Sequence, residues 1–321
     1  MPSIAQLSYL LAVARHGHFG RAASESGVSQ PSLSTQIRKL EDELGVTVFD
    51  RNKHPVIATH AGEQVLELAR TVVSEHRRLI HFCETRGQGL AGTFTLGVIP
   101  TAAPYVVPLF LDSFAKASPL VKLAIEEVET RELVRALLDD RIDAGIAATP
   151  IDEPRIRTDA LYYEPFSVYL AAKHPLLKKK VIRDEMLDRG ELWLLENGHC
   201  LRDQAARACS VGKGASAYSN VTFEAGSLDT LRQIVRSGRG YTLVPELFVQ
   251  SLPLAERKAH VRPIAKPVPT REVSVLYRRD HLKAEIRDAL AGTIRAALPK
   301  RVFTSQSAAL RVLDATPLPE R

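Results

Sequence analysis

Two cysteines, Cys200 and Cys209, stand at the ends of a segment whose composition favours a helix. The residues between them are Leu, Arg, Asp, Gln and several Ala, without Gly or Pro. In a regular helix, which rises about 1.5 Å and turns about 100° per residue, such positions lie roughly 13 Å apart on opposite faces. A disulfide needs Cα atoms within roughly 7 Å. The segment therefore cannot be helical and disulfide-bonded at once. Oxidation would convert it from the helical conformation to a second, non-helical one.

The composition indicates the kind of compartment in which this pair would operate. Three cysteines in 321 residues are too few for a disulfide framework. The sequence begins without a charged segment followed by an apolar core, and it contains no run of about 18 apolar residues, so we expect a cytoplasmic protein without a membrane anchor. In a reducing compartment, a pair that oxidises is more typical of a transient sensor than of a structural bond. The alternative is two inert, buried cysteines that pack as small hydrophobic side chains.

The length predicts about two domains, and a hydrophobic content of 45% is ample for a core in each. The net charge of +6 permits a polyanionic partner but does not establish one.

The N-terminal residues predict three helices in the order of a helix-turn-helix domain. The first spans residues 6–15, and the second spans residues 20–26 and is stopped by Gly27. Ser29 is placed to cap the third helix, and Pro31 falls in its first turn. The apolar residues of the third helix recur at helical spacing and are expected to face the core: Leu33, Ile37, Leu40 and Leu44. The opposite face is polar and can enter a major groove.

Two short strands, at residues 46–49 and 55–58, are predicted after the third helix. The hairpin between them carries Arg51 and Lys53, which such a wing would place next to a phosphate backbone. On the hairpin alone, a solvated pair of basic residues is an equally good interpretation.

Thr59 is placed to cap a long helix that reaches residue 83 or 86. Two apolar seams run along this helix and predict a coiled coil between two chains: Val65, Leu68, Val72, Leu79 and Phe82 on one, and Leu66, Ala69, Val73, Ile80 and Cys83 on the other. We expect Cys83 to be a packed small hydrophobic residue. The glycine-rich stretch at residues 87–92 is the best candidate for a hinge.

Strand-like and helix-like runs alternate beyond residue 92 and favour a parallel α/β architecture in two lobes. The first lobe is predicted to contain strands at 93–99, 121–128 and 143–148 and helices at 104–117 and 131–139. The second is predicted to contain strands at 166–172, 192–195, 220–225 and 241–244, the Cys200 helix and a helix at 228–237. A strand at 272–277 and a helix at 282–298 then return to the first lobe, and residues 302–321 are expected to be loosely tethered. Ligands of such sheets bind between lobes, at the carboxyl ends of strands.

These motifs resemble those of LysR-type transcriptional regulators. The resemblance rests on RAA at 21–23, VSQPSLS at 28–34, QIRKLE at 36–41 and LG at 44–45. The remainder is similar to the effector domain of the family's peroxide-sensing members, through GHCLRDQA at 198–205 with Cys209, IPT at 99–101, ET at 129–130 and SLDTLR at 227–232. The match spans roughly residues 1–300. Thr270 departs from it, because the family more often has a second Arg before Arg271.

The resemblance implies a winged helix-turn-helix domain at residues 1–59, a linker and dimerisation helix at 60–90, a two-lobed, periplasmic-binding-protein-like α/β effector domain at 91–300, and a tail at 301–321. It implies double-stranded DNA as a partner and a homodimer or homotetramer as the assembly. The residues expected to contact DNA are Arg21, Gln30, Pro31, Ser32, Ser34, Thr35, Gln36, Arg38, Arg51 and Lys53.

The resemblance further implies that Cys200 attacks hydrogen peroxide and that Cys209 resolves the resulting sulfenic acid to a disulfide, which a thiol-reducing system such as glutaredoxin or thioredoxin would reverse. The start of a helix favours a thiolate at Cys200, whereas the charge of Asp203 disfavours it, so Asp203 is better suited to relay a proton. The residues expected to bind peroxide are Thr101, Thr130, His199, Asp203 and Arg271. Without the resemblance, each of the two threonines reads as an ordinary helix cap.

Two other functions remain open. A LysR-type regulator of a small organic effector would keep the fold and the DNA site, with incidental cysteines. A thiol peroxidase would use both cysteines but has no use for a helix-turn-helix. No cofactor or metal is expected, and an activating regulator is favoured over an enzyme.

Overall fold

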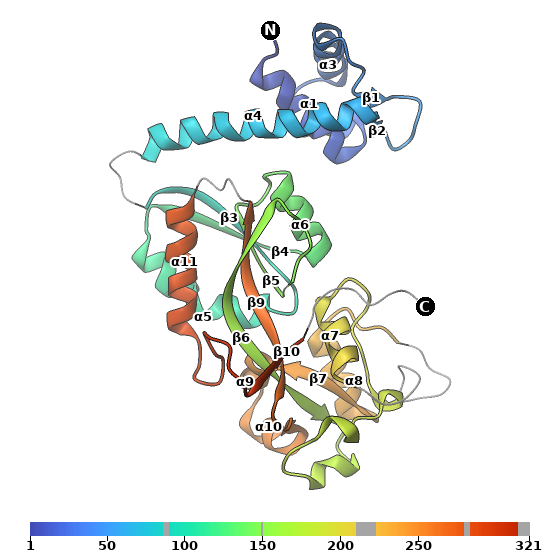
Figure 1. The fold of residues 1–321 in the computed structure, drawn as a ribbon, viewed down its shortest axis with the longest axis vertical. Coiled ribbons are helices and arrows are strands. Elements are labelled where there is room, and N and C mark those ends of the chain that lie inside the picture. The colour runs from blue at the N-terminus through green and yellow to red at the C-terminus, as the bar shows by residue number, and fades with distance from the viewer. Residues whose placement is uncertain (86–89, 149, 210–222, 279–282, 314–321) are drawn as a thin grey trace. The chain divides into compact units, whose positions relative to one another are not determined.

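The computed structural model describes residues 1–85, 90–148, 150–209, 223–278 and 283–313. The chain forms two compact units, residues 1–92 and 93–321 (Figure 1). Half of the predicted hinge at residues 87–92 lies outside the described residues. None of the helices in the described ranges is both long and apolar enough to cross a membrane.

The first unit begins with the three predicted helices. They are α1 (Ile4–His16), α2 (Phe19–Glu25) and α3 (Gln30–Leu44), which confirms the helix-turn-helix order. Ser3 forms a capping box with Gln6 at the start of α1, and Ser29 Oγ accepts a hydrogen bond from the Ser32 backbone N–H at the start of α3. Helices α1 and α3 therefore each begin directly after a serine whose side chain caps the helix.

The apolar face of α3 packs in the core of the first unit, with one exception. Leu33, Ile37 and Leu40 are fully buried, but Leu44 is 39% exposed, so the prediction for Leu44 was wrong. Leu44 is the last residue of α3, and Gly45 then takes a left-handed conformation (φ 66°) that turns the chain away.

The wing strands are shorter than predicted. Strand β1 (Phe49–Asp50) pairs antiparallel with β2 (Ile57–Ala58). The backbone N–H groups of Val48 and Phe49 donate instead to the buried carboxylate of Glu41, at 2.7 and 3.2 Å. A side chain of α3 therefore occupies donors that a longer strand would use.

The long helix α4 (His60–Thr85) begins as predicted, because Thr59 Oγ1 accepts a hydrogen bond from the Gly62 N–H. The apolar residues of its two seams fall into two environments. Leu66, Ala69 and Val73 are buried in the core of the first unit, whereas the exposed apolar residues are Leu68, Val72, Leu79 and Ile80. Only part of the stripe is therefore available to a second chain. Cys83 is exposed in the single chain, so its packing against a second chain stays a prediction.

The strands of the second unit form one sheet that extends through both lobes. The first lobe contains β3 (Gly92–Val98), α5 (Ala103–Ala117), β4 (Val121–Glu127), α6 (Thr130–Leu138), β5 (Ala144–Ala148) and α11 (Ala284–Ala297). The sheet order is β4-β3-β5-β9-β6-β7, in which β6 (Ile156–Leu170) and β9 (Val268–Arg278) run through both lobes. Figure 1 shows the first-lobe sheet between α6 on one side and α5 with α11 on the other.

The expected parallel sheet was wrong. Strand β3 is parallel to β5, but β9 is antiparallel to both β5 and β6, and β6 is antiparallel to β7. Neighbouring parallel strands are usually joined by a crossover helix. Strand β9 instead enters the first lobe from the second, so it is not bound to run parallel to β5. The sheet is therefore mixed.

The second lobe contains the Cys200 helix, α7 (Cys200–Ala208), followed by α8 (Leu228–Ser237), β7 (Tyr241–Pro245), α9 (Glu246–Ser251), α10 (Leu254–His260) and β8 (Val261–Pro263), with short 3-10 turns at Pro175–Lys178, Asp184–Met186 and Arg189–Glu191. The predicted strand at 192–195 forms only isolated bridges, Leu192 with Tyr241 and Leu195 with Ala225. Half of the strand predicted at 220–225 lies outside the described residues.

The C-terminal residues are attached more firmly than predicted. Strand β10 (Leu310–Val312) pairs in parallel with β9, and Leu313 belongs to the buried core of the second lobe. Residues 302–313 therefore form part of the fold, and residues 314–321 lie outside the described residues.

Candidate functional site

Cys200 lies where the two lobes of the second unit meet. It is the first residue of α7, and its Sγ lies 3.0 Å from Oγ1 of Thr130, the first residue of α6 in the first lobe. Glycines on the sheet let α6 approach closely, because a Cβ on Gly145 would lie 2.5 Å from Leu133 Cδ2. The packing of α6 thus fixes the position of the hydroxyl that contacts the thiol.

Burial raises the pKa of the Cys200 thiol above its ordinary value. The hydrogen bond with Thr130 and the backbone at the start of α7 lower this pKa, and the negative charge of Asp203 raises it, but burial has the largest effect. The backbone at the start of α7 therefore favours the thiolate, as expected, but burial outweighs it. The opposing effect of Asp203 is confirmed.

Arg271 and Thr101, two of the predicted peroxide-binding residues, are hydrogen-bonded to each other. The Arg271 guanidinium is fully buried and forms an ion pair with Glu164 at 2.8 Å. It also donates to the Thr101 Oγ1 and carbonyl oxygen, each at 3.2 Å. The Arg271 guanidinium lowers the pKa of Cys200, but its effect is smaller than those of burial, Thr130, Asp203 and the backbone.

Sequence reasoning missed Glu164, which is also fully buried and accepts a hydrogen bond from the Leu247 N–H at 2.6 Å. A signal was present, because a single carboxylate lies within the otherwise apolar and aromatic run at residues 161–166. A buried carboxylate needs a cationic partner, and Arg271 was already a candidate.

His199 and Asp203 lie on either side of Cys200 in the chain. His199 is the N-cap residue of α7, but its side chain makes no capping hydrogen bond and is buried. Asp203 is half-buried in the first turn of α7. The structure therefore brings Thr130, His199 and Asp203 around Cys200, with the Arg271 and Thr101 pair close enough to affect it electrostatically.

Cys209 follows the last residue of α7 and is fully buried. The Tyr241 hydroxyl donates a hydrogen bond to its Sγ at 3.5 Å. Both cysteines are free, and the regular helix between them matches the prediction for the reduced segment. The inner face of α7 is held by Leu201, Ala205 and Ala208 in the core and by Gln204, whose Nε2 donates to the Leu313 carbonyl oxygen at 3.3 Å.

The first unit presents most of the predicted DNA-contacting residues at its surface. Those exposed are Arg21, Gln30, Pro31, Ser32, Thr35, Arg38 and Lys53, and those partly exposed are Ser34, Gln36 and Arg51. All but Arg21, Arg51 and Lys53 belong to α3, so they extend along one groove-sized helix.

Two members of this set also have structural contacts. Gln36 Oε1 accepts a hydrogen bond from Gln6 Nε2 at 3.3 Å, which joins α3 to α1. Arg51 donates to Glu41 at 2.6 Å and lies over the Phe19 ring. Arg51 therefore neutralises the buried carboxylate that anchors the wing, whereas Lys53 is exposed.

Comparison with known proteins gives matches over both units. The model of the bacterial regulatory helix-turn-helix protein, lysR family, matches residues 4–63, and that of the LysR substrate binding domain matches residues 87–298. The hydrogen peroxide-inducible genes activator of Dickeya chrysanthemi is 37% identical over 276 residues, which cover 86% of this chain and 89% of that protein.

Two solved structures are similar as well. A full-length OxyR variant from Pseudomonas aeruginosa is 35% identical, with a TM-score of 0.74 and coverage of 91% of this chain and 97% of that one. A Corynebacterium glutamicum OxyR variant with hydrogen peroxide bound is 31% identical, with a TM-score of 0.58 and coverage of 92% of each chain. Because the family models span the helix-turn-helix and both lobes, this chain belongs to the LysR family of bacterial regulators.

Proposed function

We propose that this chain is a DNA-binding transcription regulator that senses hydrogen peroxide by oxidising Cys200 and joining it to Cys209. The observation that carries the proposal is the position of the thiol, which meets the Thr130 hydroxyl at the boundary between lobes, at the opposite end of α7 from Cys209. The similarity to a peroxide-inducible activator and to a peroxide-bound OxyR variant supports it.

The chemistry needs two steps. Cys200 loses its proton, and the thiolate attacks one oxygen of hydrogen peroxide, so that an S–O bond forms, the O–O bond breaks and the second oxygen leaves, after protonation, as water. The Cys209 thiolate then attacks the Cys200 sulfur, the S–S bond forms and the hydroxyl leaves as water. The two cysteines lose two electrons, which reduce the peroxide.

The surrounding residues have separate roles in this proposal. Thr130 stabilises the thiolate by donating a hydrogen bond, and Asp203 transfers a proton to the departing oxygen. His199 provides a donor beside the thiol. Thr101, oriented by Arg271, contributes a hydroxyl to hold peroxide.

The disulfide would change the second lobe because α7 cannot remain helical once it forms. Unwinding α7 removes its buried face from the core and breaks the contact between Gln204 and Leu313. We propose that a homodimer or homotetramer, assembled in part through the exposed apolar residues of α4, transmits this change to the DNA. In the cytoplasm, a thiol-reducing system such as glutaredoxin or thioredoxin would restore the reduced form.

The first prediction concerns the two cysteines. Cys200→Ser should abolish the transcriptional response to peroxide without loss of DNA binding, because the thiol and α3 belong to different units. Cys209→Ser should trap a sulfenic acid at Cys200, detectable by mass spectrometry with a sulfenic acid probe. A Cys200→Ser protein that still responds to peroxide would contradict the proposal and favour a small organic effector.

The second prediction concerns the hydroxyl at the lobe boundary. Thr130→Val should slow the oxidation of Cys200 by about tenfold to a hundredfold, because a hydrogen bond to a charged group contributes about 1.5–3 kcal/mol. The rate is measured as loss of free thiol in excess peroxide. Thr130→Ser, which keeps the hydroxyl, is the matched control and should react at nearly the original rate. Equal rates in all three proteins would remove Thr130 from the mechanism.

The third prediction separates the roles of the wing and α3. Lys53→Ala should weaken binding to operator and unrelated DNA alike and reduce the log–log salt slope by about one unit, as expected for a phosphate contact. Gln30→Ala should instead reduce discrimination among operator bases. Arg51→Ala should weaken DNA binding and also speed amide exchange at Val48 and Phe49, because Glu41 loses its cation. If Lys53→Ala were the only variant that changed sequence preference, the roles assigned to the wing and to α3 would be reversed.

A further inference from the structure

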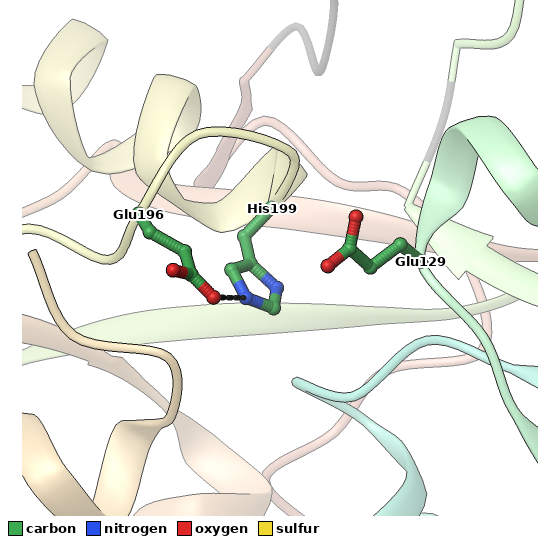
Figure 2. Close-up of side chains that lie close together, drawn as sticks. All are labelled: Glu129, Glu196 and His199. Carbon is green, nitrogen blue, oxygen red and sulfur yellow. Dashed lines mark ion pairs between the residues drawn. The ribbon is translucent and has the colours of Figure 1, made fainter.

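Three side chains that could bind a metal ion lie close together near Cys200, and the thiol is not one of them. Glu129 immediately precedes α6 in the first lobe, and Glu196 and His199 lie in the loop before α7 in the second. One ligand atom from each residue lies within 4.8 Å of the other two. Figure 2 shows the His199 ring between the two carboxylates.

One nitrogen of the His199 imidazole lacks a hydrogen bond in this arrangement. Its side chain is only 4% exposed, and its buried Nε2 forms no hydrogen bond with any described residue. Nε2 faces the Glu196 carboxylate at 3.8 Å, which is longer than a hydrogen bond (Figure 2). A buried nitrogen without a partner is costly, so the geometry indicates a missing ligand.

The backbone allows Glu129 to reach this position. Gly198 has a φ of 106°, and a Cβ added to it would lie 2.9 Å from Glu129 Oε2. A larger residue would be strained at this φ and would also push the carboxylate away from His199. The Glu129 side chain makes no capping hydrogen bond to α6.

We propose that Glu129, Glu196 and His199 form a binding site for a divalent transition-metal cation, of which Zn²⁺ fits the ligands best. One imidazole nitrogen and two carboxylate oxygens are ligands that Zn²⁺ accepts, with water in the fourth position. Tetrahedral Zn²⁺ ligands stand about 3.4 Å apart, given metal–ligand distances of about 2.0–2.2 Å. Glu129 is exposed and Glu196 is half-buried, so both carboxylates are free to close on the cation.

A cation at this site would connect the two lobes. Glu129 is adjacent in the chain to Thr130, and His199 is adjacent to Cys200, so the cation would hold the same two helix starts that the Thr130–Cys200 contact joins. The site uses no sulfur atom. Cation binding can therefore be measured in a chain that lacks Cys200, even though His199 also belongs to the proposed peroxide site.

The test is equilibrium dialysis of the reduced full-length chain against Zn²⁺, followed by metal analysis. We expect Glu129→Gln and His199→Gln each to weaken this binding at least tenfold, because each removes one ligand. Glu127→Gln removes a nearby exposed carboxylate that is not in the cluster, so it is the matched control and should bind as the original chain does. Circular dichroism checks that each variant is folded, and Glu129→Gln is informative even if the buried His199 does not tolerate replacement.

Thiols also bind Zn²⁺, so Co²⁺ provides a second readout. The Co²⁺ form should lack a sulfur-to-metal charge-transfer band, and Cys200→Ser should bind as tightly as the original chain. The proposal is overturned if no stoichiometric binding occurs, if Glu127→Gln weakens binding as much as Glu129→Gln, or if binding is lost with Cys200.

Discussion

The helical geometry of α7 is the constraint on which the rest of the site depends. While residues 200–208 are helical, Cys200 and Cys209 point to separate environments, one toward the Thr130 hydroxyl and the other toward Tyr241. The helix is held by its buried face, in which a side chain such as Leu201 contributes about 1.5–3 kcal/mol. A chemical bond between the cysteines can overcome contacts of this size, which makes the segment suitable as a switch.

The candidate site joins residues of the shared sheet to a helix that oxidation would unwind. Arg271 lies on β9 and Glu164 on β6, the two strands that run through both lobes, so their buried ion pair sits on the part of the sheet that the lobes share. Cys200, in contrast, is on a helix that the disulfide would unwind. Because burial raises the pKa of Cys200, the hydrogen bond from Thr130 is the main feature that favours the reactive thiolate. In the proposed mechanism, contacts between lobes thus control the chemistry, and the product of the chemistry changes one lobe.

Local sequence signals were sufficient for most helices, including α7 and α8, because caps, glycine stops and apolar spacing act within a few residues. They were insufficient where distant residues decide the outcome. The direction of β9, the exposure of Leu44, the pairing of β10 and the raised pKa of Cys200 all depend on which segments pack together. The cluster of Glu129, Glu196 and His199 was not predicted for the same reason, since its members come from both lobes.

Amide hydrogen exchange across residues 201–208 tests the central claim most directly. After peroxide treatment, and with the disulfide between Cys200 and Cys209 established by mass spectrometry, exchange in this segment should be faster than in the reduced chain, because the helix can no longer form. The same treatment of Cys209→Ser should leave its protection unchanged. Full protection of residues 201–208 in a chain that contains the disulfide would contradict the account, since it would mean that oxidation does not unwind α7.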